Sequence, residues 1–116
     1  MGFIFQRNIV LFQIKYGVRI MFIYRAMRDT EYDSVCEKFP LSWDSKCKWF
    51  SDDLNFILER VRDGKFNNSK FKDNAYRNIV KYRVRNPSVL IRVSDNELML
   101  RRKSQPLVGI EFVELL

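Results

Sequence analysis

The chain has 116 residues, a length that suits one domain with one hydrophobic core. Hydrophobic residues make up 47% of it and charged residues 30%, a balance that excludes a disordered segment and predicts a folded domain with a polar surface. The formal net charge of +7 favours an anionic partner such as nucleic acid, a phosphorylated ligand, an acidic protein or a membrane surface.

Histidine is absent from the chain, and cysteine occurs only as Cys36 and Cys47. The absence of histidine excludes His-based zinc sites and nucleophile pairs such as Ser–His or Cys–His. Two cysteines alone cannot complete a structural zinc site, so we expect no metal site. The two cysteines can form a disulfide or remain as reduced, partly buried thiols of an intracellular protein, and their low number favours the thiols.

Residues 1–20 contain no acidic residue, and polar side chains interrupt their apolar runs. No run approaches the roughly 18 residues that span a bilayer, and the unbroken apolar core of a secretory signal is absent, so we expect no membrane span. We divide the chain into an accessory strand pair or upstream extension, residues 1–20, and a single domain, residues 21–116. An ordinary first hairpin of the sheet is the alternative for residues 1–20.

The single domain begins with an apolar strand at residues 21–25, which ends in an arginine. Four apolar residues then recur at helical spacing before Pro40, which predicts a helix capped by Asp29 or Thr30. These four residues are Tyr32, Val35, Cys36 and Phe39. Residues 41–48 contain serines and charges, and we expect a loop there.

A second helix is predicted after the aromatic pair Trp49-Phe50, with Ser51 or Asp52 as its N-cap. Its apolar positions follow the spacing i, i+3, i+4 and i+7. They are Leu54, Ile57, Leu58 and Val61. Gly64 ends this helix, because glycine adopts the left-handed conformation without strain. The Asn- and Lys-rich residues that follow, to about Asn74, are predicted to be a surface loop or a weak helical turn.

The second half of the chain has the pattern of strands. Residues 76–85 alternate between apolar and basic side chains, and residues 89–93 are apolar enough for the centre of a sheet. Residues 97–100 are short and extended, residues 101–106 are predicted to be an exposed basic loop, and residues 107–116 form a closing strand. The fold class is therefore α+β, with two helices in the N-terminal half packed on a mostly antiparallel sheet.

Three segments together resemble the mono-ADP-ribosyltransferases of the cholera-toxin type. In that family an aromatic–arginine pair ends the first strand, and Tyr24-Arg25 is similar. An aromatic residue and a serine at the end of a strand precede a helix, as Phe50-Ser51 does here. A glutamate follows a strand and a turn, as Glu97 does. The late hydrophobic strand also fits the order of the family.

The resemblance covers residues 21–116 and implies an ADP-ribosyltransferase-like fold with NAD as cofactor. It implies that Arg25 holds a phosphate or ribose of NAD through its guanidinium. Ser51 would brace the glutamate or contact the nicotinamide ribose. Glu97 would accept a hydrogen bond from the 2′-OH of that ribose and stabilise positive charge as the nicotinamide bond opens.

The resemblance also implies that Asp95 orients or deprotonates the acceptor, and that Trp49, Phe50 or Tyr24 stacks on the cofactor. The chain departs from the family at two places. The second Ser or Thr that usually accompanies the motif serine is missing beside Ser51, and Asp95 stands where the family has Glu or Gln. An inactive relative with the same fold is the other interpretation of the resemblance.

Each candidate residue also has a structural interpretation. Ser51 can be a helix N-cap, Arg25 an ion-paired arginine, and Glu97 a surface charge. The aromatic residues beside Ser51 can belong to the core. Glu111 is an alternative carboxylate, because a neighbouring strand could carry it to the same cleft.

Two functions follow from these alternatives. The first is an NAD-consuming transferase that modifies a protein or nucleic-acid acceptor, as a toxin, effector or phage-encoded modifier does, in the cytoplasm or after delivery into a host or target cell. The second is a non-catalytic small basic binding module, such as an inhibitor or antitoxin, that contacts nucleic acid or an acidic protein surface. Its basic face would consist of Arg77, Lys81, Arg83, Arg85, Arg101, Arg102 and Lys103. A ribonuclease that uses Lys, Glu and Arg for acid–base chemistry is a third option.

Overall fold

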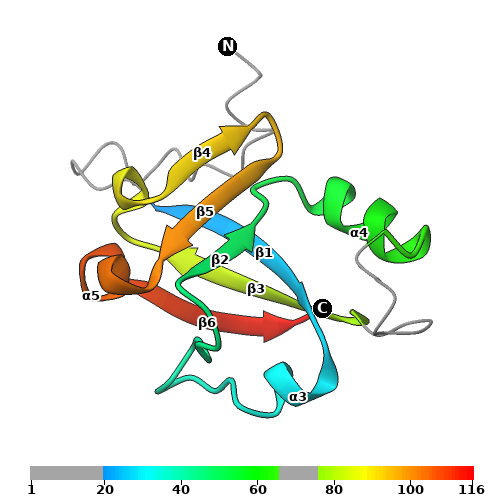
Figure 1. The fold of residues 1–116 in the computed structure, drawn as a ribbon, viewed down its shortest axis with the longest axis horizontal. Helices are drawn as coiled ribbons and strands as arrows, with labels where there is room; N and C mark the ends of the chain where they lie inside the picture. Colours follow the sequence, from blue (N-terminus) through cyan, green and yellow to red (C-terminus); the bar gives the residue numbers. More distant parts are fainter. Residues whose placement is uncertain (1–19, 66–75) are drawn as a thin grey trace.

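A computed structural model describes residues 20–65 and 76–116 of the chain (Figure 1). The expectations for residues 1–19 and 66–75 lie outside the described residues. Two antiparallel sheets of three strands each are present, with strand orders β1-β3-β6 and β2-β5-β4. The strands are β1 (Met21–Met27), β2 (Cys47–Phe50), β3 (Asn78–Val84), β4 (Ile91–Ser94), β5 (Glu97–Arg101) and β6 (Ile110–Leu115). The predicted α+β class is confirmed, but the expectation of one sheet is wrong.

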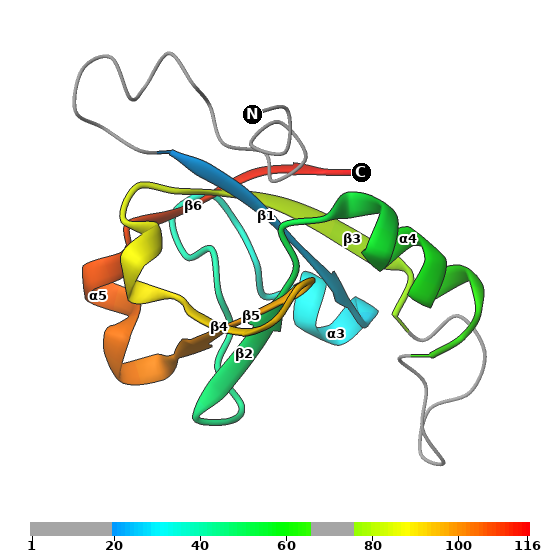
Figure 2. The ribbon, with the colours of Figure 1, turned by 90° about the horizontal axis from the view of Figure 1, so that it is seen from above.

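The helical segments are short and few. They are α3 (Asp29–Tyr32), α4 (Leu54–Arg62) and α5 (Gln105–Val108), with 3-10 turns η1 (Pro87–Val89) and η2 (Arg102–Ser104). Figure 2 shows the two sheets as separate layers, with α4 beside β1 and β3. The arrangement therefore places one face of the β1-β3-β6 sheet against the second sheet and the other face partly against α4.

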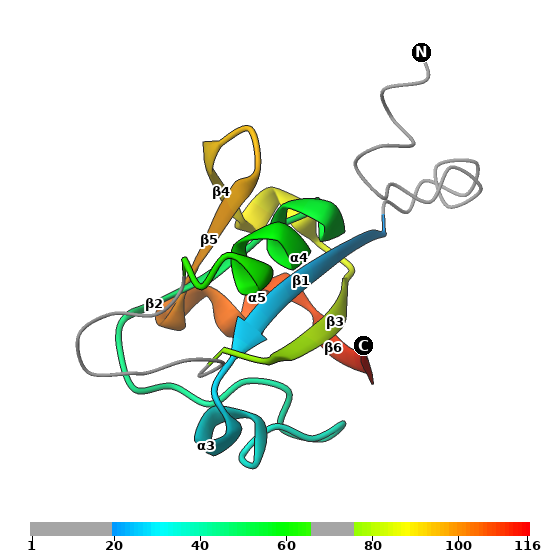
Figure 3. The same cartoon turned by 90° about the vertical axis from the view of Figure 1, so that its right-hand side faces the viewer.

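The main core fills the space between the two sheets. Its buried residues include Ile23, Phe50, Val80, Tyr82, Val84, Leu98 and Leu100. Strand side chains point alternately to the two faces of a sheet, so every second residue of β3 enters this core. The smaller cluster on the opposite face of β1 and β3 contains Tyr24, Ala26, Ile57 and Ile79. Figure 3 shows α4 alongside β1, where this second cluster lies.

Helix α4 is confirmed, but its N-cap is Asp53 and not Ser51 or Asp52. The Asp53 side chain accepts hydrogen bonds from the backbone amides of Asn55 and Phe56. Gly64 adopts the left-handed conformation, with a φ of 68°. Its amide donates to the Val61 carbonyl at 3.1 Å, and the Lys65 amide donates to the Arg60 carbonyl at 2.9 Å. This pair of bonds is the Schellman motif, which explains why the helix ends at the predicted glycine.

The helix predicted to run from Asp29 to Phe39 is wrong beyond its first turn, because α3 ends at Tyr32. Phe39 is 64% exposed, so the apolar spacing does not form a buried face. The next two residues are an aspartate and Ser34, whose short polar side chains compete with helical backbone bonds. Tertiary contact fixes the irregular segment instead, since the buried Tyr82 hydroxyl donates to the Pro40 carbonyl at 2.7 Å.

The second half of the chain contains two further corrections. The apolar segment at residues 89–93 was expected at a sheet centre, but β4 is an edge strand and β5 is central. The reason is that β5 buries Leu98 and Leu100 against the first sheet, whereas the β4 side chains remain exposed. The predicted basic loop at residues 101–106 instead forms the end of β5, the 3-10 turn η2 and the start of α5.

Both cysteines are free thiols, with Cys36 exposed and Cys47 half-buried. The disulfide that the sequence allowed is therefore not formed. Within the described residues, α4 is the longest helix with 9 residues, and none of the helices has the length and apolarity to cross a bilayer.

Replacement of Asp53 by alanine tests the position of the helix cap. Asp53→Ala removes the acceptor for two unpaired amides, so we expect it to lower the free energy of unfolding by about 1 kcal/mol. Asp53→Asn keeps a capping oxygen and should lower the free energy of unfolding by only about 0.3 kcal/mol. Urea unfolding followed by circular dichroism measures both values. Equal stability of Asp53→Ala and the wild type would show that this cap contributes nothing.

Candidate functional site

A pocket of about 450 Å³ opens between the β1 strand, the β2-β5-β4 sheet and α4. Its lining includes Arg25, Trp49, Phe50, Arg60 and Glu97, and we call it the central pocket. Its volume falls within the range of roughly 300–1,000 Å³ of small-molecule sites. Arg25 comes from the first sheet and Glu97 from the second, so the pocket exists only because the two sheets meet here.

A two-bond backbone bridge joins the sheets at the edge of the pocket. The Tyr24 amide donates to the Ser51 carbonyl at 2.8 Å, and the Ser51 amide donates to the Tyr24 carbonyl at 2.9 Å. This bridge holds β1 beside the end of β2. Arg25 Nη1 can therefore reach the Trp49 carbonyl, to which it donates at 2.9 Å.

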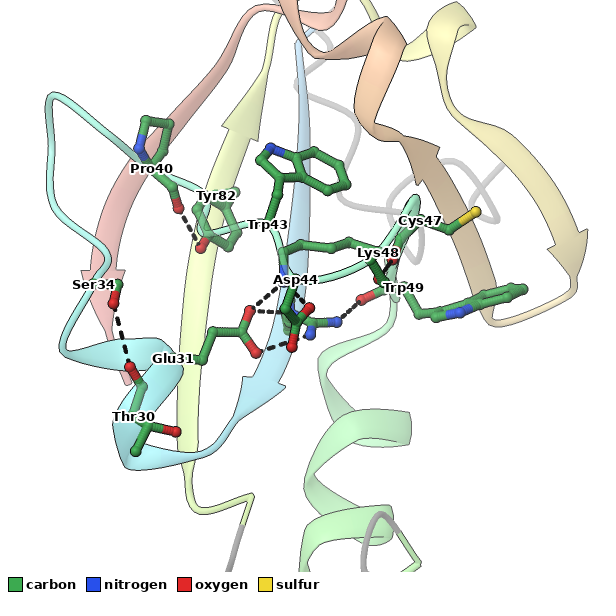
Figure 4. A network of polar contacts seen from close by, with 12 residues as sticks. Thr30, Glu31, Ser34, Pro40, Trp43, Asp44, Cys47, Lys48, Trp49 and Tyr82 are labelled. Carbon is green, nitrogen blue, oxygen red and sulfur yellow. Dashed lines mark hydrogen bonds and ion pairs between the residues drawn. The ribbon is translucent and has the colours of Figure 1, made fainter.

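Arg25 belongs to a polar cluster with Glu31 and Lys48. Figure 4 labels Glu31, Lys48 and the neighbouring Asp44. Its Nε and Nη2 donate to Glu31 Oε2 and Oε1 at 2.8 and 2.9 Å, a bidentate pair. Lys48 Nζ, on a side chain only 2% exposed, donates to Glu31 Oε2 at 2.9 Å. Asp44, whose side chain is highly exposed, lies 3.9 Å from Lys48 Nζ, so Lys48 has a second acidic neighbour. Within the described residues the cluster therefore holds two cations and two carboxylates, and the partly buried Glu31 is the carboxylate that contacts both cations.

The ionisation of Glu31 reflects these two cations. Burial by itself raises the pKa of its carboxyl, but the hydrogen bonds and charges of Arg25 and then Lys48 outweigh burial, so the pKa lies below its ordinary value. The carboxylate form is therefore favoured in the folded protein. Glu31 is therefore negatively charged at neutral pH, where it accepts two hydrogen bonds from Arg25.

A second charged contact connects the start of α4 to the β4–β5 turn. The Asp52 carboxylate is fully buried and accepts from Arg92 Nη2. Arg92 Nη1 donates to the backbone carbonyls of Ser94 and Asp95, each at 3.0 Å. This turn immediately precedes Glu97, so Arg92 holds the candidate carboxylate in position relative to the end of β2.

The three residues of the predicted motif at β1 and β2 differ in access to the pocket. Ser51 is fully buried, and its hydroxyl donates to the Asp53 carbonyl at 3.1 Å and accepts from the Asp53 amide at 3.0 Å. Tyr24 is buried in the cluster under α4 and is not among the described residues that line the pocket. Phe50 does line it, and the Arg25 guanidinium lies 6.0 Å from the centre of the Phe50 ring.

The three candidate carboxylates lie in different places. Glu97 lines the central pocket, and its Oε1 accepts from the Ser94 hydroxyl at 3.2 Å. Asp95 is exposed on the turn two residues earlier. Glu111 lies on β6 and accepts from Arg83 and Arg85, whose hydrogen bonds lower its pKa. The structure thus brings Arg25 together with Glu97 and leaves Glu111 on another strand of the first sheet.

Three charged residues that support the site, Glu31, Lys48 and Arg92, were not predicted from the sequence. Each is a charged residue beside apolar or aromatic residues, which is the signal that could have identified it. Lys48 directly precedes Trp49, and Arg92 interrupts an apolar run. A charge in such a place is either exposed at a sheet edge or paired, because an unpaired buried charge is costly.

Comparison with known proteins assigns no family to this arrangement. No protein-family model matches the sequence, and no curated protein or solved structure matches it. We therefore infer the function from the chemistry of the central pocket.

Replacement of Glu31 by glutamine tests the role of the buried cluster. Glu31→Gln leaves Lys48 buried without its acid, so we expect a loss of about 3 kcal/mol in the free energy of unfolding at pH 7. Because the folded-state pKa of Glu31 is lowered, its contribution is complete above about pH 4.3, the ordinary value, and falls as the pH drops through the lowered pKa. The gap between variant and wild type should therefore shrink in acid. Urea unfolding at several pH values measures it.

The matched control is Glu111→Gln, which removes a carboxylate from a solvent-exposed pair of arginines. It should cost less than about 1 kcal/mol at pH 7. A Glu31→Gln variant that is no less stable than this control at neutral pH would contradict the buried role of Glu31.

Proposed function

We propose that the chain is an NAD-consuming mono-ADP-ribosyltransferase whose reaction takes place in the central pocket. The observation that carries the proposal is the convergence of Arg25 and Glu97, from two different sheets, on one pocket that also has Trp49 and Phe50 in its lining. A guanidinium, a carboxylate and aromatic rings are the groups that a charged dinucleotide with two flat bases requires.

The guanidinium of Arg25 supports the binding of the diphosphate of NAD. A guanidinium has five N–H donors, and three bonds from Arg25 are accounted for by Glu31 and the Trp49 carbonyl. Two donor hydrogens remain for an anionic ligand. Glu31 is shared between Arg25 and Lys48, so its charge is divided between two cations, and a phosphate near the remaining donors of Arg25 is attracted by the guanidinium.

The reaction needs no histidine. The bond between ribose C1′ and the nicotinamide nitrogen breaks, and its electron pair leaves with neutral nicotinamide. Glu97 accepts a hydrogen bond from the ribose 2′-OH and stabilises the positive charge that develops at C1′. A nucleophilic atom of the acceptor then bonds to C1′, and the proton of that atom passes to Asp95 or to water. Electrostatic stabilisation of the developing charge is the main contribution of the protein.

Ser51 has a supporting role in this proposal. Its hydroxyl is fully buried and bonded to the Asp53 backbone, so it braces the turn between β2 and α4. Through the backbone bridge to Tyr24, the same residue fixes β1 next to the pocket. Ser51 therefore sets the position of Arg25 without contacting the ligand.

A non-catalytic binding module is the second candidate function. It is favoured by the internal bonding of Arg25 and Ser51, because both can be explained as parts of a stable fold. In this candidate Glu97 is a surface carboxylate that performs no chemistry. The two candidates differ in one measurable property, the release of nicotinamide.

Replacement of Glu97 by glutamine separates the two candidates. We expect the wild type to release nicotinamide from NAD, and Glu97→Gln to lower that rate at least about 100-fold because it removes charge stabilisation in the transition state. Nicotinamide is quantified by chromatography after incubation of the purified protein with NAD, with and without a cell lysate as a source of acceptor.

Glu111→Gln is the matched control, since it makes the same chemical change on another strand and should leave the rate within about twofold. Circular dichroism and urea unfolding confirm that both variants are folded. Background release by the wild type, equal to that of Glu97→Gln, would refute the transferase and leave the binding module.

A further inference from the structure

We propose that the outer face of the β2-β5-β4 sheet, together with a cationic pocket at its edge, binds single-stranded nucleic acid. The outer face is defined by Cys47 and Trp49 on β2, Met99 and Arg101 on β5, and Ile91 on β4. Trp49 also lines the central pocket, but the cationic pocket and the rest of this face have no part in the proposed NAD chemistry. The role of this surface in leading an acceptor to Glu97 rests on the proposed function. Its binding of nucleic acid does not.

The register of the sheet places an apolar row on this face. Trp49 and Ile91 both pair with Met99, so the three side chains lie side by side across the three strands. Trp49 is 47% exposed and Ile91 is 38% exposed, although both are large and apolar. The intervening residue Lys48 points to the opposite side, and Figure 4 shows it directed toward Glu31 while Trp49 projects away. An exposed aromatic on a sheet face is a platform on which a base can stack.

A pocket of about 790 Å³ lies at the end of this row. It is lined by Lys46, Cys47, Arg101, Arg102, Lys103 and Pro106, and none of these is acidic. Cys47 on β2 pairs with Arg101 on β5, and this pair is the next one on the outer face after Trp49 and Met99. The pocket therefore continues the outer face. Its four cations have no ion pair within the described residues. Four unpaired cations in one hollow favour a polyanion.

The basic residues of the first sheet differ in this respect. Arg77 is paired with Asp29, and Arg83 and Arg85 share Glu111. Lys81 Nζ lies over the Phe22 ring, 4.4 Å from its centre. Most cations along β3 therefore have a partner, whereas the four cations of the cationic pocket have no ion pair within the described residues.

Strand β5 connects the cationic pocket to the central pocket. Glu97, Met99 and Arg101 are every second residue of β5, so their side chains lie on the same face. The strand spans about 13 Å from Glu97 to Arg101. A flexible chain whose phosphate occupies the cationic pocket can lay a base on Trp49 and continue toward Glu97. Single-stranded nucleic acid fits this arrangement better than a duplex, because only unpaired bases expose their faces for stacking. An acidic peptide would match the cations but would leave Trp49 in the apolar row without a stacking partner.

Fluorescence anisotropy with a labelled single-stranded oligonucleotide, in the absence of NAD, tests the surface. Arg102→Ser combined with Lys103→Ser should weaken binding at least about tenfold and reduce the slope of log K against log salt by about 1.4, or 0.7 for each cation lost. Arg83→Ser combined with Arg85→Ser changes the net charge equally and should leave affinity within about threefold, because Glu111 already neutralises part of that charge.

The role of Trp49 in the apolar row is tested separately. Trp49→Ala should weaken binding about tenfold by loss of base stacking, whereas Phe39→Ala, which removes another exposed aromatic from a distant loop, should have no effect. Equal losses for the two charge variants would show a diffuse electrostatic effect and overturn the proposal. Binding of duplex as tight as that of single strands, or capture of acidic peptides alone, would overturn it as well.

The experiment separates this proposal from the transferase. Glu97→Gln should bind the oligonucleotide no more weakly than the wild type, because Glu97 contributes only negative charge to the face. Oligonucleotide binding without nicotinamide release would support the surface and refute the enzyme. Nicotinamide release by a wild type that does not bind the oligonucleotide would support the enzyme and refute the surface.

Discussion

The backbone bridge between Tyr24 and Ser51 fixes where the two sheets meet, and the central pocket is built around that junction. It is a single residue pair, yet it joins the outer edge of the β1-β3-β6 sheet to the segment that leaves β2 for α4. Without it, the Arg25 guanidinium could not reach the Trp49 carbonyl and the central pocket would lose one wall. The apolar core between the two sheets fixes their separation but is not directional.

Buried charge makes this junction specific. Arg25 and Lys48 share Glu31 on one side of the bridge, and Arg92 connects Asp52 to the β4–β5 turn on the other. Apolar residues would tolerate small shifts of one sheet against the other, whereas a buried ion pair is costly unless its geometry is maintained. These pairs therefore hold β1, β2 and the β4–β5 turn in a fixed arrangement around the central pocket.

Much of the fold was predictable because it depends on local patterns. The alternation of residues 76–85 identified β3, and the spacing of Leu54, Ile57 and Val61 together with Gly64 identified α4 and its end. The pair Arg25 and Glu97 could be named only through a family resemblance. Glu31 and Arg92 were not found, because their importance depends on what lies opposite them across the sheets.

Local sequence patterns were enough to establish the α+β class, the main strands and one helix, since neighbouring residues set backbone conformation and the direction of each side chain. The number of sheets, the end of α3 after one turn and the pairing of individual cations emerged only in the folded structure. Those features depend on contacts between segments far apart in the chain. The free energy of a buried charge or a sheet edge is set by its partner across space, and local sequence does not specify that partner.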